Sequence, residues 1–213
     1  MAEIIDLTYA LSPDTVMYPG LPQPSFEQFF TVESEGANVT QITFVSHAGT
    51  HIDAPTHVCE DGATVDALPL DRLIGEATVV DLSAREEPNV ITREDLAAHD
   101  ASIRAGDILL LITGIYRAYG TAAYNDACPA LAKHAAEWLV GKGISAYATD
   151  ATSIERPGST GNPMHRILLG AGIPIIENLA NVERLTTGRI RLVALPMKLA
   201  GLDGGPCRVV ALR

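Results

Sequence analysis

The feature that most restricts this chain is a dense group of polar side chains around a glycine and a proline. Three histidines and an aspartate lie within eleven residues, although the whole chain contains six histidines: His47, His51, Asp53 and His57. A helix would place His47 and His51 on one face, but Gly49 and Pro55 inside the same segment disfavour a helix. We therefore expect an extended segment with a turn at the glycine.

An extended backbone can bring the same side chains together. The segment Val39–His47 is predicted to be a β-strand that ends at His47. If the chain turns at Gly49 and stays extended, His51 and Asp53 project to the same side, because residues two apart share a face. Two imidazoles and a carboxylate can then converge on one ion. Such ligands suit Zn²⁺, and Mn²⁺ or Fe²⁺ where carboxylate or water ligands are added.

A competing interpretation is that these are ordinary polar residues on a turn. For a single histidine that interpretation would hold. For the full cluster a metal site is favoured, because burying so many polar groups is costly unless an ion satisfies them together.

Length and charge narrow the remaining possibilities. The 213 residues are 47% hydrophobic and contain no linker or repeat, so residues 1–213 are expected to form a single domain. No apolar run of about 20 residues predicts a membrane span, and no secretory signal opens the chain, so a cytoplasmic protein is expected. A formal charge of -11 without a Lys/Arg cluster argues against a nucleic-acid partner. Three scattered cysteines predict no disulfide framework.

Hydrophobic periodicity predicts a mixed α/β fold. Runs of β-branched residues bounded by Gly, Pro or Asp predict eight strands: Ile4–Thr8, Val39–His47, Ala77–Leu82, Ile108–Thr113, Ile144–Thr149, Ile173–Ile176, Ile190–Leu195 and Arg208–Leu212. Capping signals predict three helices: one from Thr92 to near His99, one from Pro129 to Gly141 or Gly143, and one from Asn162 through Leu168.

The segment His47-Ala-Gly-Thr-His51-Ile-Asp53-Ala-Pro-Thr-His57 resembles the signature of the cyclase-like metal-dependent hydrolases, which include kynurenine formamidases and isatin hydrolases. Further segments resemble the family in the same order: Ile5–Thr8, Leu11–Pro13, Tyr18–Gly20, Thr149–Ser153 and Leu195–Pro206. The resemblance covers nearly the whole chain. It implies an α/β fold of the swivelling β/β/α type, with mixed sheets and flanking helices. It also implies a homodimer or larger homo-oligomer whose pocket borrows residues from a neighbour.

The resemblance implies five metal ligands and one or two divalent ions per subunit, zinc first and manganese as the alternative. His47, His51 and Asp53 would bind one ion, and Asp53 would bridge to a second ion held by His165 and Glu177. From the residues themselves, His165 stands in a predicted first helical turn and Glu177 ends an apolar strand, both common places for sites. A solvated strand terminus is the other interpretation of Glu177.

His57 is predicted to be the catalytic acid/base. It follows Pro55, which displaces it from the ligand segment, and a neutral histidine near pH 7 suits proton transfer. The alternative is a third histidine ligand to the first ion. Asp150 has two interpretations: it holds the second nitrogen of a ligand histidine, or it caps a turn.

The leading functional hypothesis is a metal-dependent hydrolase of a small amide, formamide or cyclic amide that uses metal-activated water. The alternatives are a metal-dependent cyclase or dehydratase, and a metal-stabilised binding protein without turnover. Kynurenine formamidases typically carry Trp-Pro-Gly-Asp where this chain has Tyr18-Pro-Gly-Leu21, which puts N-formylkynurenine in doubt as the substrate. Phe26, Phe29 and Phe30 are expected to pack in the core rather than wall a pocket.

Overall fold

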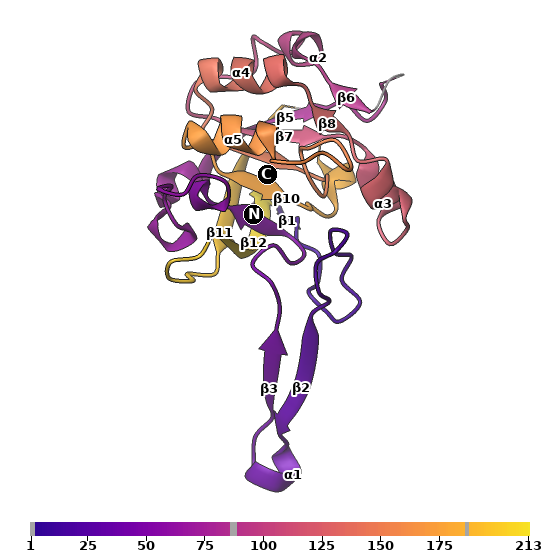
Figure 1. Cartoon of the computed structure of the whole chain (residues 1–213). Coiled ribbons are helices and arrows are strands. Elements are labelled where there is room, and N and C mark those ends of the chain that lie inside the picture. Colours follow the sequence, from indigo (N-terminus) through magenta and orange to yellow (C-terminus); the bar gives the residue numbers. More distant parts are fainter. Residues whose placement is uncertain (1–2, 86–88, 186–187) are drawn as a thin grey trace.

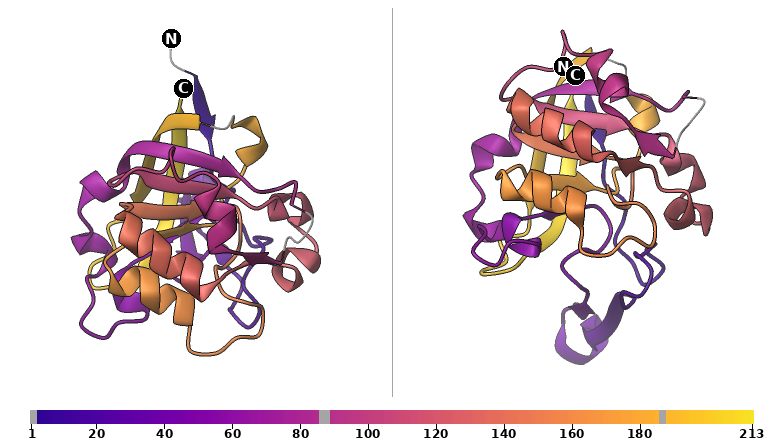
Figure 2. Two further views of the ribbon diagram at one scale, coloured as in Figure 1. Left: turned by 90° about the horizontal axis from the view of Figure 1, so that it is seen from above. Right: turned by 45° about the horizontal axis from the view of Figure 1, so that its top comes forward.

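A sheet that closes on itself forms the centre of the protein (Figures 1 and 2). The computed structural model describes residues 3–85, 89–185 and 188–213, and its main sheet has the strand order β1-β12-β11-β5-β7-β9-β10-β4. Because β4 also pairs with β12, seven strands form a barrel-like ring, and β1 is added beside β12. The strands are β1 (Ile4–Asp6), β4 (His51–Asp53), β5 (Ile74–Asp81), β7 (Ile108–Ile112), β9 (Ala146–Thr149), β10 (Ile175–Glu177), β11 (Gly188–Pro196) and β12 (Gly204–Leu212).

Both faces of strand β7 are buried, and its sequence agrees with this. All five of its residues are apolar and buried, as expected for a strand paired in parallel on both edges, here with β5 and β9. Leu110 packs into the core enclosed by the ring, whereas Leu109 and Leu111 belong to a second core outside it.

Helices cover the outer core on one side of the ring (Figure 1). The α-helices of the main body are α2 (Arg93–Ala97), α3 (Ala123–Asp126), α4 (Lys133–Lys142) and α5 (Pro163–Gly170), and the short 3₁₀ helices are η1 (Pro55–His57), η2 (Val65–Ala67), η3 (Leu70–Arg72), η4 (Ile115–Ala118) and η5 (Val182–Arg184). Leu139 of α4 and Leu168 of α5 are fully buried in this core. The mixed α/β class with flanking helices is confirmed. None of the helices in the described ranges is long and apolar enough to cross a membrane.

The helix predicted from Thr92 is confirmed. Thr92 accepts a hydrogen bond from the backbone N–H of Asp95, and the Asp95 carboxylate accepts one from the backbone N–H of Thr92. This reciprocal cap satisfies donors that the first helical turn leaves free.

The helix predicted to begin at Pro129 begins later. Ala130 and Leu131 instead form the short strand β8 (Ala130–Leu131), which pairs in parallel with β6 (Val90–Ile91). The backbone N–H of Leu131 also donates to the carbonyl of Ile154. These tertiary hydrogen bonds outweigh the helical preference of a proline-led segment, so α4 starts at Lys133.

The strand predicted over Val39–His47 is too long, and it lies outside the main sheet. β3 (Val39–Thr43) ends at Thr43 and pairs only with β2 (Ser25–Phe30). Together with α1 (Val32–Glu35) they form a projecting arm, residues 25–43 (Figure 1).

Every residue of the arm is exposed. Phe26, Phe29 and Phe30 therefore do not pack in the core, and that prediction is wrong: their exposed fractions are 38%, 62% and 40%. The alternation of the arm's sequence indicated strands correctly, but it could not indicate that no other layer of the same chain covers them.

Candidate metal centre

Strand β4 places the central residues of the site. Gly49 has a φ of +62°, which a glycine adopts without a steric penalty, and the chain turns there into β4. Ile52 is buried in the barrel core, and the side chains of its two neighbours in β4 approach each other, with 3.2 Å between His51 Nε2 and Asp53 Oδ1. β4 lies between β10 and β12, and its His51 is paired in register with Glu177. The extended geometry predicted for this segment is the one observed.

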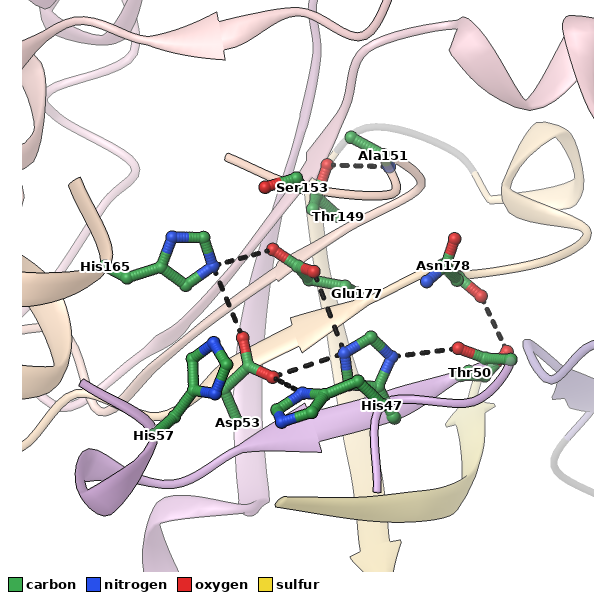
Figure 3. A network of polar contacts seen from close by, with 12 residues as sticks. His47, Thr50, Asp53, His57, Thr149, Ala151, Ser153, His165, Glu177 and Asn178 are labelled. Carbon is green, nitrogen blue, oxygen red and sulfur yellow. Dashed lines mark hydrogen bonds and ion pairs between the residues drawn. The ribbon is translucent and has the colours of Figure 1, made fainter. Parts of the chain in front are cut away.

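The carboxylate of Asp53 lies at the centre of the cluster and uses both of its oxygens (Figure 3). Oδ1 is 2.7 Å from His47 Nδ1 and 3.2 Å from His51 Nε2. Oδ2 is 3.5 Å from His165 Nε2. Asp53 therefore lies between two groups of possible ligands, with Oδ1 facing one group and Oδ2 facing the other.

His165 and Glu177 complete the second group. His165 is in the first turn of α5, as predicted, and its Nε2 is 3.4 Å from Glu177 Oε1. Asp53, His165 and Glu177 are at least 95% buried. Two sets of donor atoms lie close enough to hold an ion: one from His47, His51 and Asp53, and one from Asp53, His165 and Glu177.

Two of these side chains carry an oxygen without a hydrogen-bond partner. Asp53 Oδ2 and Glu177 Oε1 are buried and accept no hydrogen bond from the described residues. An unpaired buried carboxylate oxygen is costly, and a cation at that point would remove the cost. The imidazole and carboxylate donors also match what divalent zinc or manganese prefers. The residues present therefore fit a divalent metal ion.

Hydrogen bonds on the far side of each ring fix which nitrogen faces the cluster. His51 Nδ1 is 2.9 Å from the carbonyl of Gly49, which only accepts, so Nδ1 carries the hydrogen and Nε2 faces Asp53. His165 Nδ1 is 3.0 Å from Glu155 Oε1, which leaves its Nε2 facing Asp53 and Glu177.

His57 lies beside the cluster rather than within either set of ligands. It ends η1, two residues after Pro55, and its ring centre is 4.2 Å from that of His47 and 5.7 Å from that of His165. Its Nδ1 is 3.5 Å from Asp203 Oδ2. His47, His57 and Asp203 form a third group whose donor atoms lie close together.

The charges of the cluster shift the pKa values of its members. Burial opposes the charge of Asp53, but the positive charge of His47 and the ring nitrogens of His165, His47 and His51 close to the carboxylate hold the pKa of Asp53 well below its usual range. Burial alone would lower the pKa of His47, yet the carboxylates of Asp53 and Asp203 raise it to about 9. For His57, burial dominates and lowers the pKa. A neutral imidazole therefore stands next to a charged one.

Close packing beneath His47 explains a glycine in β12. A Cβ on Gly204 would lie 2.7 Å from the carbonyl oxygen of Ile52 and 2.9 Å from Cε1 of His47. Any larger side chain would push the His47 ring away from Asp53.

The sequence did not identify two acidic residues around the cluster. Glu155 contacts His165, and Asp203 Oδ2 is 2.9 Å from His47 Nε2. Glu155 follows the segment Thr149–Ser153 closely, and that position was its only signal. Asp203 lies within the segment Leu195–Pro206, which resembles the family, but no role was predicted for it.

Asp150 takes the capping role, not the histidine-holding one. Its carboxylate accepts hydrogen bonds from the backbone N–H groups of Thr113, Gly114 and Tyr116 and from the hydroxyl of Thr113. Burial raises the pKa of Asp150, and these donors offset part of that effect. It therefore secures the turn after β7.

A cavity of about 210 Å³ opens onto the cluster. The histidines and acids described above form one part of its lining. Val16, Tyr18 and Leu21 form an apolar part, and Thr152 and Asn178 add neutral polar groups. The segment Tyr18–Leu21 thus shapes the pocket, as the resemblance implies.

Comparison with known proteins agrees with this geometry. Residues 5–156 match the family model described as putative cyclase. The chain is 32% identical to a kynurenine formamidase of Salinibacter ruber over 97% of this chain and 96% of that protein. It is 31% identical to a kynurenine formamidase of Erythrobacter litoralis over 97% of this chain and 92% of that protein.

Solved structures share the fold over the full length of the chain. An isatin hydrolase A from Labrenzia aggregata superposes with a TM-score of 0.89 at 25% identity, covering 99% of this chain and 93% of that one. A predicted metal-dependent hydrolase from Bacillus stearothermophilus superposes with a TM-score of 0.85 at 32% identity, covering 100% and 98%. His165 and Glu177 lie beyond the residues matched by the family model, but both lie within the aligned length of these relatives, which is nearly the whole chain. The chain belongs to the putative cyclase family.

Proposed function

We propose that the protein is a metal-dependent hydrolase that cleaves the C–N bond of a small amide, formamide or cyclic amide. The observation that carries the proposal is the pair of buried, unpaired oxygens on Asp53 and Glu177, aimed at a cluster of histidines on one wall of a cavity. Relatives named kynurenine formamidase and isatin hydrolase supply the reaction class.

In this proposal Asp53 bridges two ion positions. His47 and His51 would complete the first position, and His165 and Glu177 the second. Zinc is our first candidate, because imidazole and carboxylate ligands suit it, and manganese is the alternative. When bound, such an ion supplies Lewis acidity that activates water and polarises a carbonyl.

The protein's own residues then guide the proton and the substrate. His57, neutral at pH 7 because burial lowers its pKa, takes a proton from the attacking water and delivers it to the leaving nitrogen. Asp203 lies beside His57 Nδ1 and holds the ring, so that Nε2 is the atom that transfers the proton. The wall of Val16, Tyr18 and Leu21 excludes water around an aromatic or aliphatic substrate.

The substrate would be identified with two probes. Leu21 lines the pocket where kynurenine formamidases typically carry an acid, so N-formyl-L-kynurenine and isatin should be tested side by side. Hydrolysis predicts products that gain one water molecule. A product that loses one water molecule would establish a dehydratase or cyclase instead, and the absence of any turnover with ions bound would favour a binding protein.

Ion binding is expected to release protons. In the ion-free protein His47, with a pKa of about 9, carries a positive charge at pH 7, and the carboxylates around His165 raise the pKa of that ring against burial. An ion needs the lone pairs of both rings, so its affinity should increase with pH up to about 9. Calorimetric titration with zinc at pH 7, in two buffers of different ionisation enthalpy, measures the released protons.

The raised pKa of His47 also determines how the stability of the ion-free protein depends on pH. Because folding raises the pKa of His47 from 6.5 to about 9, its contribution is complete below pH 6.5 and is lost as the pH rises toward 9. Thermal unfolding of the ion-free protein should therefore occur at a lower temperature at pH 9 than at pH 6.5. In the calorimetric titration with zinc, zero proton release would show that the rings of His47 and His165 are neutral before the ion binds.

We also propose that the arm joins two copies of the chain into a homodimer. It exposes Phe29 (62%) and Ile42 (51%) on its two strands and Val32 (61%) on α1, and no other element covers them among the described residues. A ribbon of this size is marginal by itself, and apolar surface of this kind marks a protein–protein contact. A cytoplasmic location stays a prediction of the sequence.

Replacing Phe29 and Ile42 with alanine is expected to weaken the dimer without unfolding the body. An aromatic anchor at an interface contributes about 2 kcal/mol, so the loss of Phe29 alone should increase the dissociation constant by roughly 30-fold, and the loss of Ile42 should add to this. Light scattering after size-exclusion chromatography measures the change, with Glu33→Gln on the same arm as the control. A wild-type protein that is monomeric at micromolar concentration would contradict the proposal.

A further inference from the structure

The orientation of His165 depends on one buried carboxylate. The ring is 4% exposed, and its Nδ1 is 3.0 Å from Glu155 Oε1. An ionised carboxylate only accepts hydrogen bonds, so Nδ1 must carry the hydrogen. Nε2 then faces Asp53 and Glu177, the two residues that complete the second ion position.

Glu155 also holds the start of α5. The same oxygen, Oε1, accepts hydrogen bonds from the backbone N–H groups of Met164 (2.7 Å) and His165 (3.0 Å). Asn162, the residue at the N-cap position, makes no side-chain capping bond. Glu155 therefore caps the helix from across the exposed loop 156–161, and the helix terminus and the histidine ring share one anchor.

The other histidine ligands are held differently. His51 donates to a backbone carbonyl, that of Gly49, and the outer partner of His47 is Asp203, whose side chain is 41% exposed. Glu155 is 5% exposed and contacts neither His47 nor His51 through any hydrogen bond or ion pair found in the described residues. The hydrogen bonds of Glu155 therefore act on His165, a ligand of the second ion position, and not on the ligands His47 and His51 of the first.

We propose that Glu155 is a positioning residue that prepares the second ion position by fixing the tautomer and orientation of His165. The assignment rests on the proposed two-ion function. A carboxylate behind a ligand histidine also makes that histidine more basic, and removal of such a partner typically lowers metal affinity by about 10- to 100-fold.

Two substitutions separate positioning from simple capping. Glu155→Gln keeps an oxygen that accepts the two backbone N–H groups, but it removes the negative charge behind His165. Glu155→Ala removes all three hydrogen bonds. Each full-length variant would be freed of ions by chelator dialysis and titrated with Zn²⁺ against a competing chelator. His165→Ala identifies which binding event belongs to the second position, and Glu137→Gln on the exposed face of α4 is the matched control.

The expected result is selective. The event that His165→Ala removes should weaken by about tenfold in Glu155→Gln and about 100-fold in Glu155→Ala, while the other event keeps its wild-type affinity. Thermal unfolding of the ion-free proteins should show a loss of stability in Glu155→Ala and a much smaller one in Glu155→Gln.

Three other results would overturn the assignment. Unchanged affinities in both variants would show that Glu155 does not act on the ion. Equal weakening of both events, together with lower stability, would show a purely structural role. If His165→Ala removes no binding event from the protein, the two-ion arrangement itself is wrong. The hydrolase function is tested separately, by hydrolysis of a substrate by the wild-type protein.

Discussion

Replacement of Asp53 with alanine is expected to abolish tight ion binding at both positions and to reduce turnover by about 1000-fold or more. Asp53 uses one oxygen toward His47 and His51 and the other toward His165, so its loss affects both sets of ligands. An ion contributes several kcal/mol to transition-state stabilisation, and each 1.4 kcal/mol is a factor of ten in rate. The measurements are metal content after dialysis and kcat/KM.

The control for this variant is a carboxylate with ordinary partners. Asp66 accepts hydrogen bonds from Thr64 and from the backbone of Gly201 and lies outside the cluster, so Asp66→Asn should keep both ions and full activity. Asp53→Ala protein that retains two tightly bound ions would show that Asp53 is not the ligand that the two positions share.

Replacement of His57 with glutamine is expected to reduce kcat by about 100-fold or more while both ions remain bound. His57 lies at the edge of the cluster, with Asp203 near its Nδ1. It belongs to neither of the two ligand sets that share Asp53, so it can transfer a proton without binding an ion. Because burial lowers its pKa, the basic form is present at pH 7, and wild-type kcat/KM should fall as the pH falls through that pKa. This acidic limb should disappear in the variant.

The outcome for His57 separates the two roles considered for it. Loss of activity together with loss of one ion would make His57 a ligand, the alternative that the sequence leaves open. Full activity on a confirmed substrate would exclude it from proton transfer. His134→Gln is the matched control, because His134 is 55% exposed on α4 and contacts only Glu94 among acidic side chains in the described residues.

The sequence predicted the strands of the ring well because their signals are local. β7 has an uninterrupted apolar run that indicates a strand by itself. β4 was not among the eight predicted strands, but its residues follow a glycine turn and were expected to be extended. The arm shows the limit of this reasoning. Alternation in Val39–Thr43 indicates a strand, but whether another layer covers it is decided by the rest of the chain, and no element of the described ranges covers it.

The candidate site shows the same contrast. His47, His51 and Asp53 are close in sequence, so spacing and a turn were sufficient to bring them together. His165 and Glu177 were implied by family resemblance, since neither spacing nor composition relates residue 53 to residues 165 and 177. Glu155 and Asp203 were missed because each acts through a histidine rather than on the ion. Contacts of that kind depend on side-chain orientation, which periodicity does not specify.

The measurement that tests the central claim most directly is hydrolysis of N-formyl-L-kynurenine and isatin by one protein preparation, first freed of ions by chelation and then supplied with zinc or manganese. Hydrolysis of at least one substrate that vanishes on chelation and returns in proportion to the ion bound is the predicted result. Turnover that persists at the same rate in the verified ion-free protein would contradict a metal-dependent hydrolase built on Asp53.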